Sequence, residues 1–111
     1  MWLINSLFRS RSKDSLGKLA ARIAQDSHRE VWNRVSHRVL LMRLNEARGY
    51  VRARAAQCIH AEVESLVRHN PQLAGRQRSE LVSRATDHVV GLVIRDVLIM
   101  PQQSAGRRRA A

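Results

Sequence analysis

Three observations predict an all-α fold for this sequence. The apolar residues are mostly Leu, Val, Ile and Ala, and the 111 residues include only two Trp, one Tyr and one Phe. Gly and Pro number five and two, which is too few for the turns of a small β fold. Apolar residues in the middle of the chain recur three or four residues apart, which places them on one side of a helix. We therefore expect a small helical bundle.

The chain is expected to contain one domain, because 111 residues suffice for a single core. Residues 1–13 form a basic and apolar N-terminal segment. Residues 14–100 carry the helical periodicity and form the domain. Residues 101–111 start with a helix-stopping proline and lack apolar periodicity, so we predict a disordered basic tail.

A short first helix is expected, capped by Ser12 or Asp14. Its apolar face consists of Leu16, Leu19, Ala20 and Ile23. Continuing that stripe would bring Glu30 onto the apolar face. Ser27 and Glu30 also match the S-x-x-E capping box, so we predict that a new helix begins at His28.

Two interpretations fit the next segment. Gly49 could be the residue that ends a helix at Arg48. Alternatively, one helix, kinked or straight, runs from residue 28 to about 68, and we favour it because no capping residue directly precedes Tyr50. Such a helix would be roughly 60 Å long. It would leave apolar surface that its own chain does not cover, so we predict a homo-oligomer.

The segment HNPQLAGRQR, residues 69–78, is expected to connect this helix to the last one. Asn70–Pro71 and Gly75 mark it as a connector, because Pro and Gly are typical of turns and helix ends. The last helix is predicted over residues 79–100, and Pro101 stops it. Its second half, VVGLVIRDVLIM, is apolar almost all round, so we expect its end to be deeply buried or to lie at an interface. The segment is too short to span a membrane.

The net charge of +11 comes from 20 basic and 9 acidic residues. Residues 1–13 and 101–111 each carry three basic residues and no acid, so more than half of the excess lies at the two ends. Such a balance favours association with nucleic acid, anionic lipid or an acidic protein surface.

The leading functional hypothesis is a small non-catalytic protein that contacts an acidic partner such as nucleic acid. Its candidate phosphate contacts are Arg34, Arg38, Arg48 and Arg52, which form one row on the central helix, together with Arg107, Arg108 and Arg109. Arg43 and Arg54 lie on the other margin, near Tyr50. The simpler alternative is that the arginine stems cover apolar surface while their charged ends stay in water. No helix-turn-helix or zinc-finger pattern accompanies the row, so base-specific recognition is not expected.

A second hypothesis is a helical adaptor at an anionic membrane surface. Its anchor, or else a strip that docks on the domain, would be Trp2, Leu3, Ile4, Leu7 and Phe8, which gather on one side of a helix. The segment is not a secretory signal, because its apolar part precedes the charges and lacks a cleavage site. A protein–protein scaffold is the third alternative.

No pattern predicts catalysis, a cofactor, a small-molecule substrate or a metal site. Nucleophile-elbow and phosphate-loop motifs are absent from the sequence. No two of the five histidines are three or four residues apart, so none forms a helical metal chelate. The lone Cys58 is expected to be a small buried apolar residue, which suits a reducing compartment and a cytoplasmic location.

Two carboxylates are predicted on apolar stripes, Glu62 on the central helix and Asp96 on the last one. An unpaired buried carboxylate is costly, so each is expected to meet an arginine or another donor. We interpret them as inter-helix ion pairs that fix the packing register. The alternative is that the two carboxylates converge as an acid/base or metal-binding pair, which no neighbouring motif supports.

Overall fold

The computed structural model describes residues 13–100 and confirms the predicted all-α bundle. The elements follow in the order α2 (Lys13–Val39), α3 (Leu44–His69), the 3₁₀ turn η1 (Pro71–Leu73) and α4 (Arg76–Ile99). No strand occurs among residues 13–100. The predicted N-terminal anchor and the three tail arginines lie outside the described residues.

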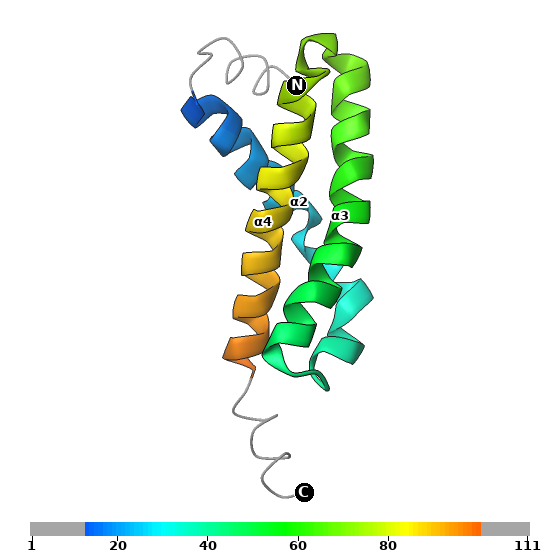
Figure 1. Cartoon of the computed structure of the whole chain (residues 1–111), viewed down its shortest axis with the longest axis vertical. Helices are drawn as coiled ribbons and strands as arrows, with labels where there is room; N and C mark the ends of the chain where they lie inside the picture. Colours follow the sequence, from blue (N-terminus) through cyan, green and yellow to red (C-terminus); the bar gives the residue numbers. More distant parts are fainter. Residues whose placement is uncertain (1–12, 101–111) are drawn as a thin grey trace, which may run out of the picture.

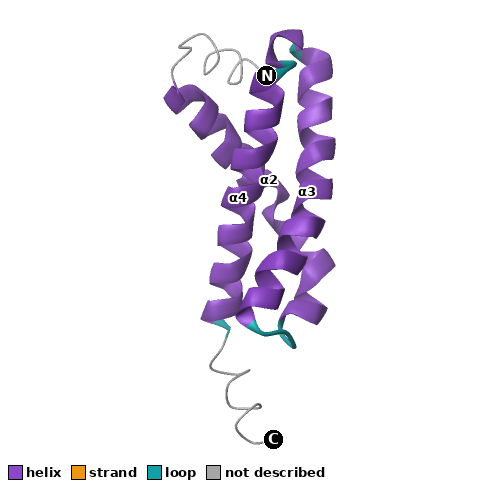
Figure 2. Ribbon diagram, in the orientation of Figure 1, coloured by secondary structure: helices purple, strands orange, loops and turns teal. Residues whose placement is uncertain are grey.

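The three helices alternate in direction and each packs against the other two. In Figure 1, α2 runs downward, α3 returns upward and α4 runs downward again. Figure 2 shows that short loops and turns join them. The bundle measures 54 × 19 × 19 Å. The end of α2, the start of α3 and the end of α4 therefore lie at the same end of the bundle.

Buried residues recur every four positions along each helix. The rows are Ser15, Leu19, Ile23, Ser27, Val31, Val35 and Val39 in α2, Ala47, Val51, Ala55, Ile59 and Val63 in α3, and Leu81, Ala85, Val89 and Val93 in α4. Each four-residue step turns the helix about 40° beyond a full circle, so the buried row winds around the helix. Ridges of this kind pack with the helices crossing at an angle. In Figure 1, α2 crosses behind α4.

The predicted helix break at Ser27 is wrong. Ser27 belongs to the buried row of α2, with 2% of its surface exposed, and the helix continues to Val39. The prediction assumed that the stripe beginning at Leu16 keeps a fixed direction and meets Glu30. Because the row winds from Ile23 through Ser27, Glu30 stays exposed.

The predicted single long helix is also wrong, since the chain turns between Val39 and Leu44. After Val39 the next position of the row is Arg43, which a continuous helix would bring onto the buried face. Burying an unpaired guanidinium is costly, so the chain turns instead. The Met42 N–H donates a hydrogen bond to the Val39 carbonyl at 3.1 Å, which closes the turn. Gly49 lies exposed inside α3 and does not end it.

The predicted connector is confirmed around Asn70, Pro71 and Gly75. Pro71 opens η1, and Gly75 has a φ of 79°, a conformation that glycine adopts without strain. The Asn70 side-chain amide donates to the Leu66 carbonyl at 3.1 Å. Helix α4 starts at Arg76, three residues before the predicted start.

The end of α4 is not deeply buried within this chain. Leu98, Ile99 and Met100 are all exposed. They follow the last row residues of α4, where the helix emerges from the bundle. Of the two predicted environments for this end, burial in the core is therefore excluded.

Replacing Ser27 by alanine is expected to raise the free energy of unfolding by about 1 kcal/mol. The Ser27 hydroxyl is buried and has no hydrogen-bond partner among the described residues. Removing it eliminates a desolvated polar group and improves helix propensity. Urea denaturation measures the change, and Ser83→Ala, at an exposed position of α4, controls for propensity alone. A loss of about 1 kcal/mol would instead support the capping role.

Candidate anion-binding site

The structure divides the predicted row of four arginines into two groups. Arg34 and Arg38 lie on α2 and face α3 across the turn. Arg52 points toward α4, where its guanidinium pairs with the Asp87 carboxylate at 2.7 Å. Arg48 is exposed one helical turn before Arg52 and lies on the same side of α3. The four residues therefore do not form one continuous stripe.

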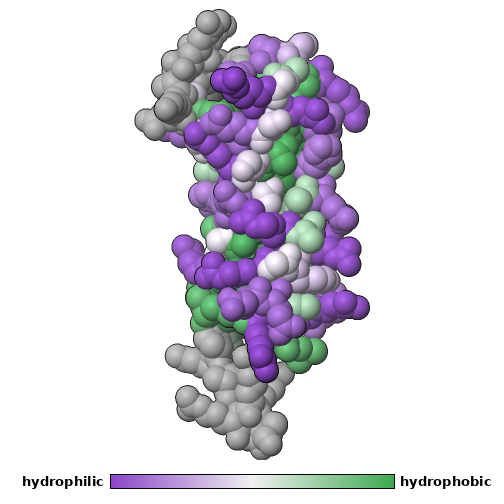
Figure 3. Space-filling view, viewed as in Figure 1, coloured by the Kyte–Doolittle hydropathy of each residue, from purple (hydrophilic) through white to green (hydrophobic). Residues whose placement is uncertain are grey.

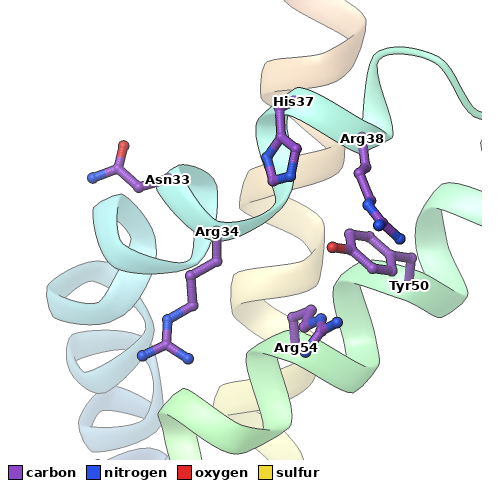
Figure 4. A pocket seen from close by; sticks show the side chains of 6 residues that line it. All are labelled: Asn33, Arg34, His37, Arg38, Tyr50 and Arg54. Atoms are coloured by element: carbon purple, nitrogen blue, oxygen red, sulfur yellow. The ribbon is translucent and has the colours of Figure 1, made fainter.

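The α2 group instead contributes to a shallow pocket of ≈ 380 Å³ between the last turns of α2 and the first turns of α3. Its lining consists of Asn33, Arg34, His37 and Arg38 from α2 and Tyr50 and Arg54 from α3. Figure 4 shows these six side chains on the neighbouring turns of α2 and α3. Three are arginines and none is a carboxylate, so the pocket is basic.

Tyr50 organises two of these arginines. The guanidinium carbon of Arg38 lies 6.0 Å from the centre of the Tyr50 ring, and that of Arg54 lies 5.4 Å from it. Arg38 comes from α2 and Arg54 from α3, so the half-buried ring joins the two helices (Figure 4). At exposed positions each cation–π contact contributes about 0.5–1 kcal/mol. The ring therefore restricts two flexible cations to one place.

The charge of this cluster is incompletely neutralised. Arg34 pairs with Glu30 one turn earlier, at 3.0 Å. Within residues 13–100, neither Arg38 nor Arg54 forms an ion pair with a carboxylate. Two positive charges close to one ring repel each other, and an anion between them would relieve that repulsion. Arginine donors in a fixed fork suit a phosphate or carboxylate.

The two predicted buried carboxylates differ in the structure. Glu62 is exposed, so the prediction that it lies on the buried face is wrong. The buried row of α3 passes through Ile59 and Val63, which turns Glu62 outward. Asp96 is half-buried, and its carboxylate lies 2.5 Å from the His28 imidazole of α2. It therefore links α2 and α4, and the partner is a histidine, one of the donors that the prediction allowed.

Cys58 is buried, as predicted from its position among apolar residues. Burial raises the pKa of its thiol, and the negative charge of Glu30 raises this pKa further. The thiol is therefore less ionised than an exposed cysteine at the same pH. This environment suits an unreactive structural residue.

Neither a metal centre nor a membrane span is found in the described part of the chain. Residues 13–100 contain no group of three or more His, Cys, Asp and Glu side chains placed to hold a metal ion. None of the helices in this range is both long and apolar enough to cross a membrane.

Four of the six lining residues, Asn33, His37, Tyr50 and Arg54, were not among the predicted site residues. Arg54 follows Tyr50 by four residues, and Arg38 follows Arg34 by four, so each pair was visible as a helical neighbour. The sequence did not indicate that the pair on α2 and the pair on α3 lie close together in space. On one continuous helix, Arg38 and Tyr50 would be roughly 18 Å apart along the axis. Only the turn after Val39 brings them together.

Comparisons of the chain with protein-family models, curated proteins and solved structures found no match.

The Cys58 thiol is expected to react slowly with Ellman's reagent in the folded protein and rapidly in urea. Burial limits access and raises the pKa, so the native reaction should accelerate only at a pH above the ordinary thiol range of about 8.5. Glutathione under the same conditions provides the reference for an exposed thiol. Equal rates for the native and the urea-unfolded chain would contradict the structural role.

Proposed function

We propose that this is a small, non-catalytic binding protein that contacts the phosphates of nucleic acid through the basic pocket around Tyr50. The observation that carries the proposal is the convergence of Arg38 and Arg54 on one ring without a neutralising carboxylate. The excess of basic residues in the whole chain would add long-range attraction to the same partner.

The composition of the pocket favours phosphate as the contacted group. Guanidinium groups donate paired hydrogen bonds to phosphate oxygens, and the Tyr50 hydroxyl and the Asn33 amide are further donors. The pocket is open and lies beside exposed arginine ends, which suits a polymer backbone passing over the surface. An enclosed apolar cavity would suit a small molecule better.

The contact should be independent of nucleotide sequence. Two guanidiniums already approach the Tyr50 ring, which leaves it less available for stacking on a base (Figure 4). Phosphate contacts position a nucleic acid but carry no sequence information directly. The proposal is therefore a non-specific phosphate contact that weakens steeply with salt.

The proposal also includes self-association, the alternative of a membrane anchor, the tail arginines and a reducing compartment. Self-association was predicted from a single long helix, which the structure replaces by two helices, so it now needs a direct test. The membrane adaptor anchored by residues 2–8 lies outside the described residues, and so does the contribution of Arg107–Arg109. We place the protein in a reducing compartment such as the cytoplasm, which the buried, free Cys58 supports.

Replacing Arg38 and Arg54 together by glutamine is expected to weaken nucleic-acid binding at least about tenfold. Loss of two phosphate contacts should also reduce the slope of log K against log salt concentration by about 2. Fluorescence anisotropy with a labelled DNA duplex and a single strand of equal length measures both quantities. For both probes, a scrambled sequence should bind with the same affinity as the original one, because the proposed contact is independent of nucleotide sequence.

The matched control is Arg68→Gln with Arg76→Gln, which removes the same charge at the opposite end of the bundle. Both residues are exposed, and neither forms an ion pair within the described residues. This control should change the affinity much less. Equal losses in the two double variants would show that binding depends on overall charge, and the proposed site would be wrong.

A further inference from the structure

One end of the bundle is markedly apolar. Its exposed large apolar residues, here called the apolar end, are Leu41, Leu44, Leu98, Ile99 and Met100. They come from the α2–α3 turn, the start of α3 and the end of α4, which the alternating helix directions bring to the same end (Figure 1). Figure 3 shows green, hydrophobic surface in this region, beside purple polar residues.

These side chains are far more exposed than ordinary surface leucines at the edge of a core. Leu41 is 86% exposed and Ile99 is 65% exposed. Single exposed apolar residues are normal on soluble proteins, but contiguous apolar patches mark interaction sites. All the large apolar residues that are exposed among residues 15–100 belong to this one end. Side chains that protrude this far can insert into a partner whose surface is deformable.

Positive charge surrounds the apolar end. Exposed arginines at this end, outside the pocket around Tyr50, are Arg43, Arg48 and Arg95. Of the carboxylates there, Glu46 is exposed, whereas Asp96 is already paired with His28. The sequence that follows Met100 contains three arginines and no acidic residue. The partner should therefore offer both apolar volume and negative charge.

The exposed apolar side chains and the surrounding positive charge decide which of two partners fits the apolar end, a second copy of the chain or an anionic bilayer. A second copy of the chain would bring identical arginines together, and facing like charges are unfavourable. An anionic bilayer offers acyl chains to the apolar side chains and negative headgroups to the arginines. Membrane attachment generally requires two such signals, because a single short apolar element binds weakly.

We propose that the apolar end docks on the surface of an anionic membrane, with Leu41 and Ile99 entering the headgroup region and the surrounding arginines contacting lipid headgroups. The helices remain outside the bilayer, since none in the described range could cross it. This inference depends on the exposed apolar residues and not on the pocket around Tyr50. It also differs from anchoring through residues 2–8.

The test is co-sedimentation of the full chain with phosphatidylcholine vesicles, with and without phosphatidylserine. The wild-type chain should bind only the anionic vesicles. Leu41→Ser with Ile99→Ser should lower partitioning at least about tenfold, because two apolar side chains no longer leave water. Both residues are exposed, so urea denaturation and nucleic-acid affinity should be unchanged. The control is Ala53→Ser with Ala61→Ser, two exposed positions of α3, which should leave vesicle binding unchanged.

Three results would overturn the inference. The first is that the wild-type chain does not bind anionic vesicles. The second is that Leu41→Ser with Ile99→Ser binds them normally, while Trp2→Ser with Phe8→Ser does not. The third is that sedimentation equilibrium shows a dimer that the Leu41 and Ile99 substitutions dissociate, which would make the apolar end a contact between copies. Failure of the nucleic-acid experiment alone leaves this inference intact.

Discussion

The structure depends on one packing constraint, which is that each helix buries a row of small aliphatic residues spaced four positions apart. Valine and alanine dominate these rows, with serine at two positions of α2. The aromatic residues Trp32 and Tyr50 pack against this core from partly buried positions. Because a four-residue step exceeds the helical repeat, the rows wind and the helices cross. Charged residues consequently lie outside the buried rows, whereas the polar residues buried between positions 15 and 100 are the uncharged Ser15, Ser27, Asn70 and Thr86.

The ends of the rows fix the positions of the two candidate functional surfaces. The row of α2 ends at Val39, and the turn that follows reverses the chain. This reversal places Arg38 near Tyr50 and so creates the basic pocket. The same turn exposes Leu41 at the end of the bundle where α4 also ends. Both surfaces therefore lie where the buried rows of the helices end.

The sequence predicted the helical class, the connector at Asn70–Pro71 and the burial of Cys58, because each depends on local composition or spacing. It did not predict the turn after Val39. Arg43 carries no side-chain capping bond, so no local signal marks the start of α3. Ser27 matched a capping motif, but its burial against other helices decides its role. The prediction placed Glu62 on the buried face because it treated the apolar row as straight, whereas the row winds around the helix.

Binding of a phosphate backbone by Arg38 and Arg54 is tested most directly by their side-chain signals in a proton–nitrogen NMR spectrum. During titration with a short duplex, the Nε–H signals of Arg38 and Arg54 should shift together at low ligand concentration. Those of Arg22 and Arg84, which pair with carboxylates within their own helices, should remain in place. Shifts confined to Arg107–Arg109, with Arg38 and Arg54 unchanged, would show that the pocket around Tyr50 does not bind the duplex.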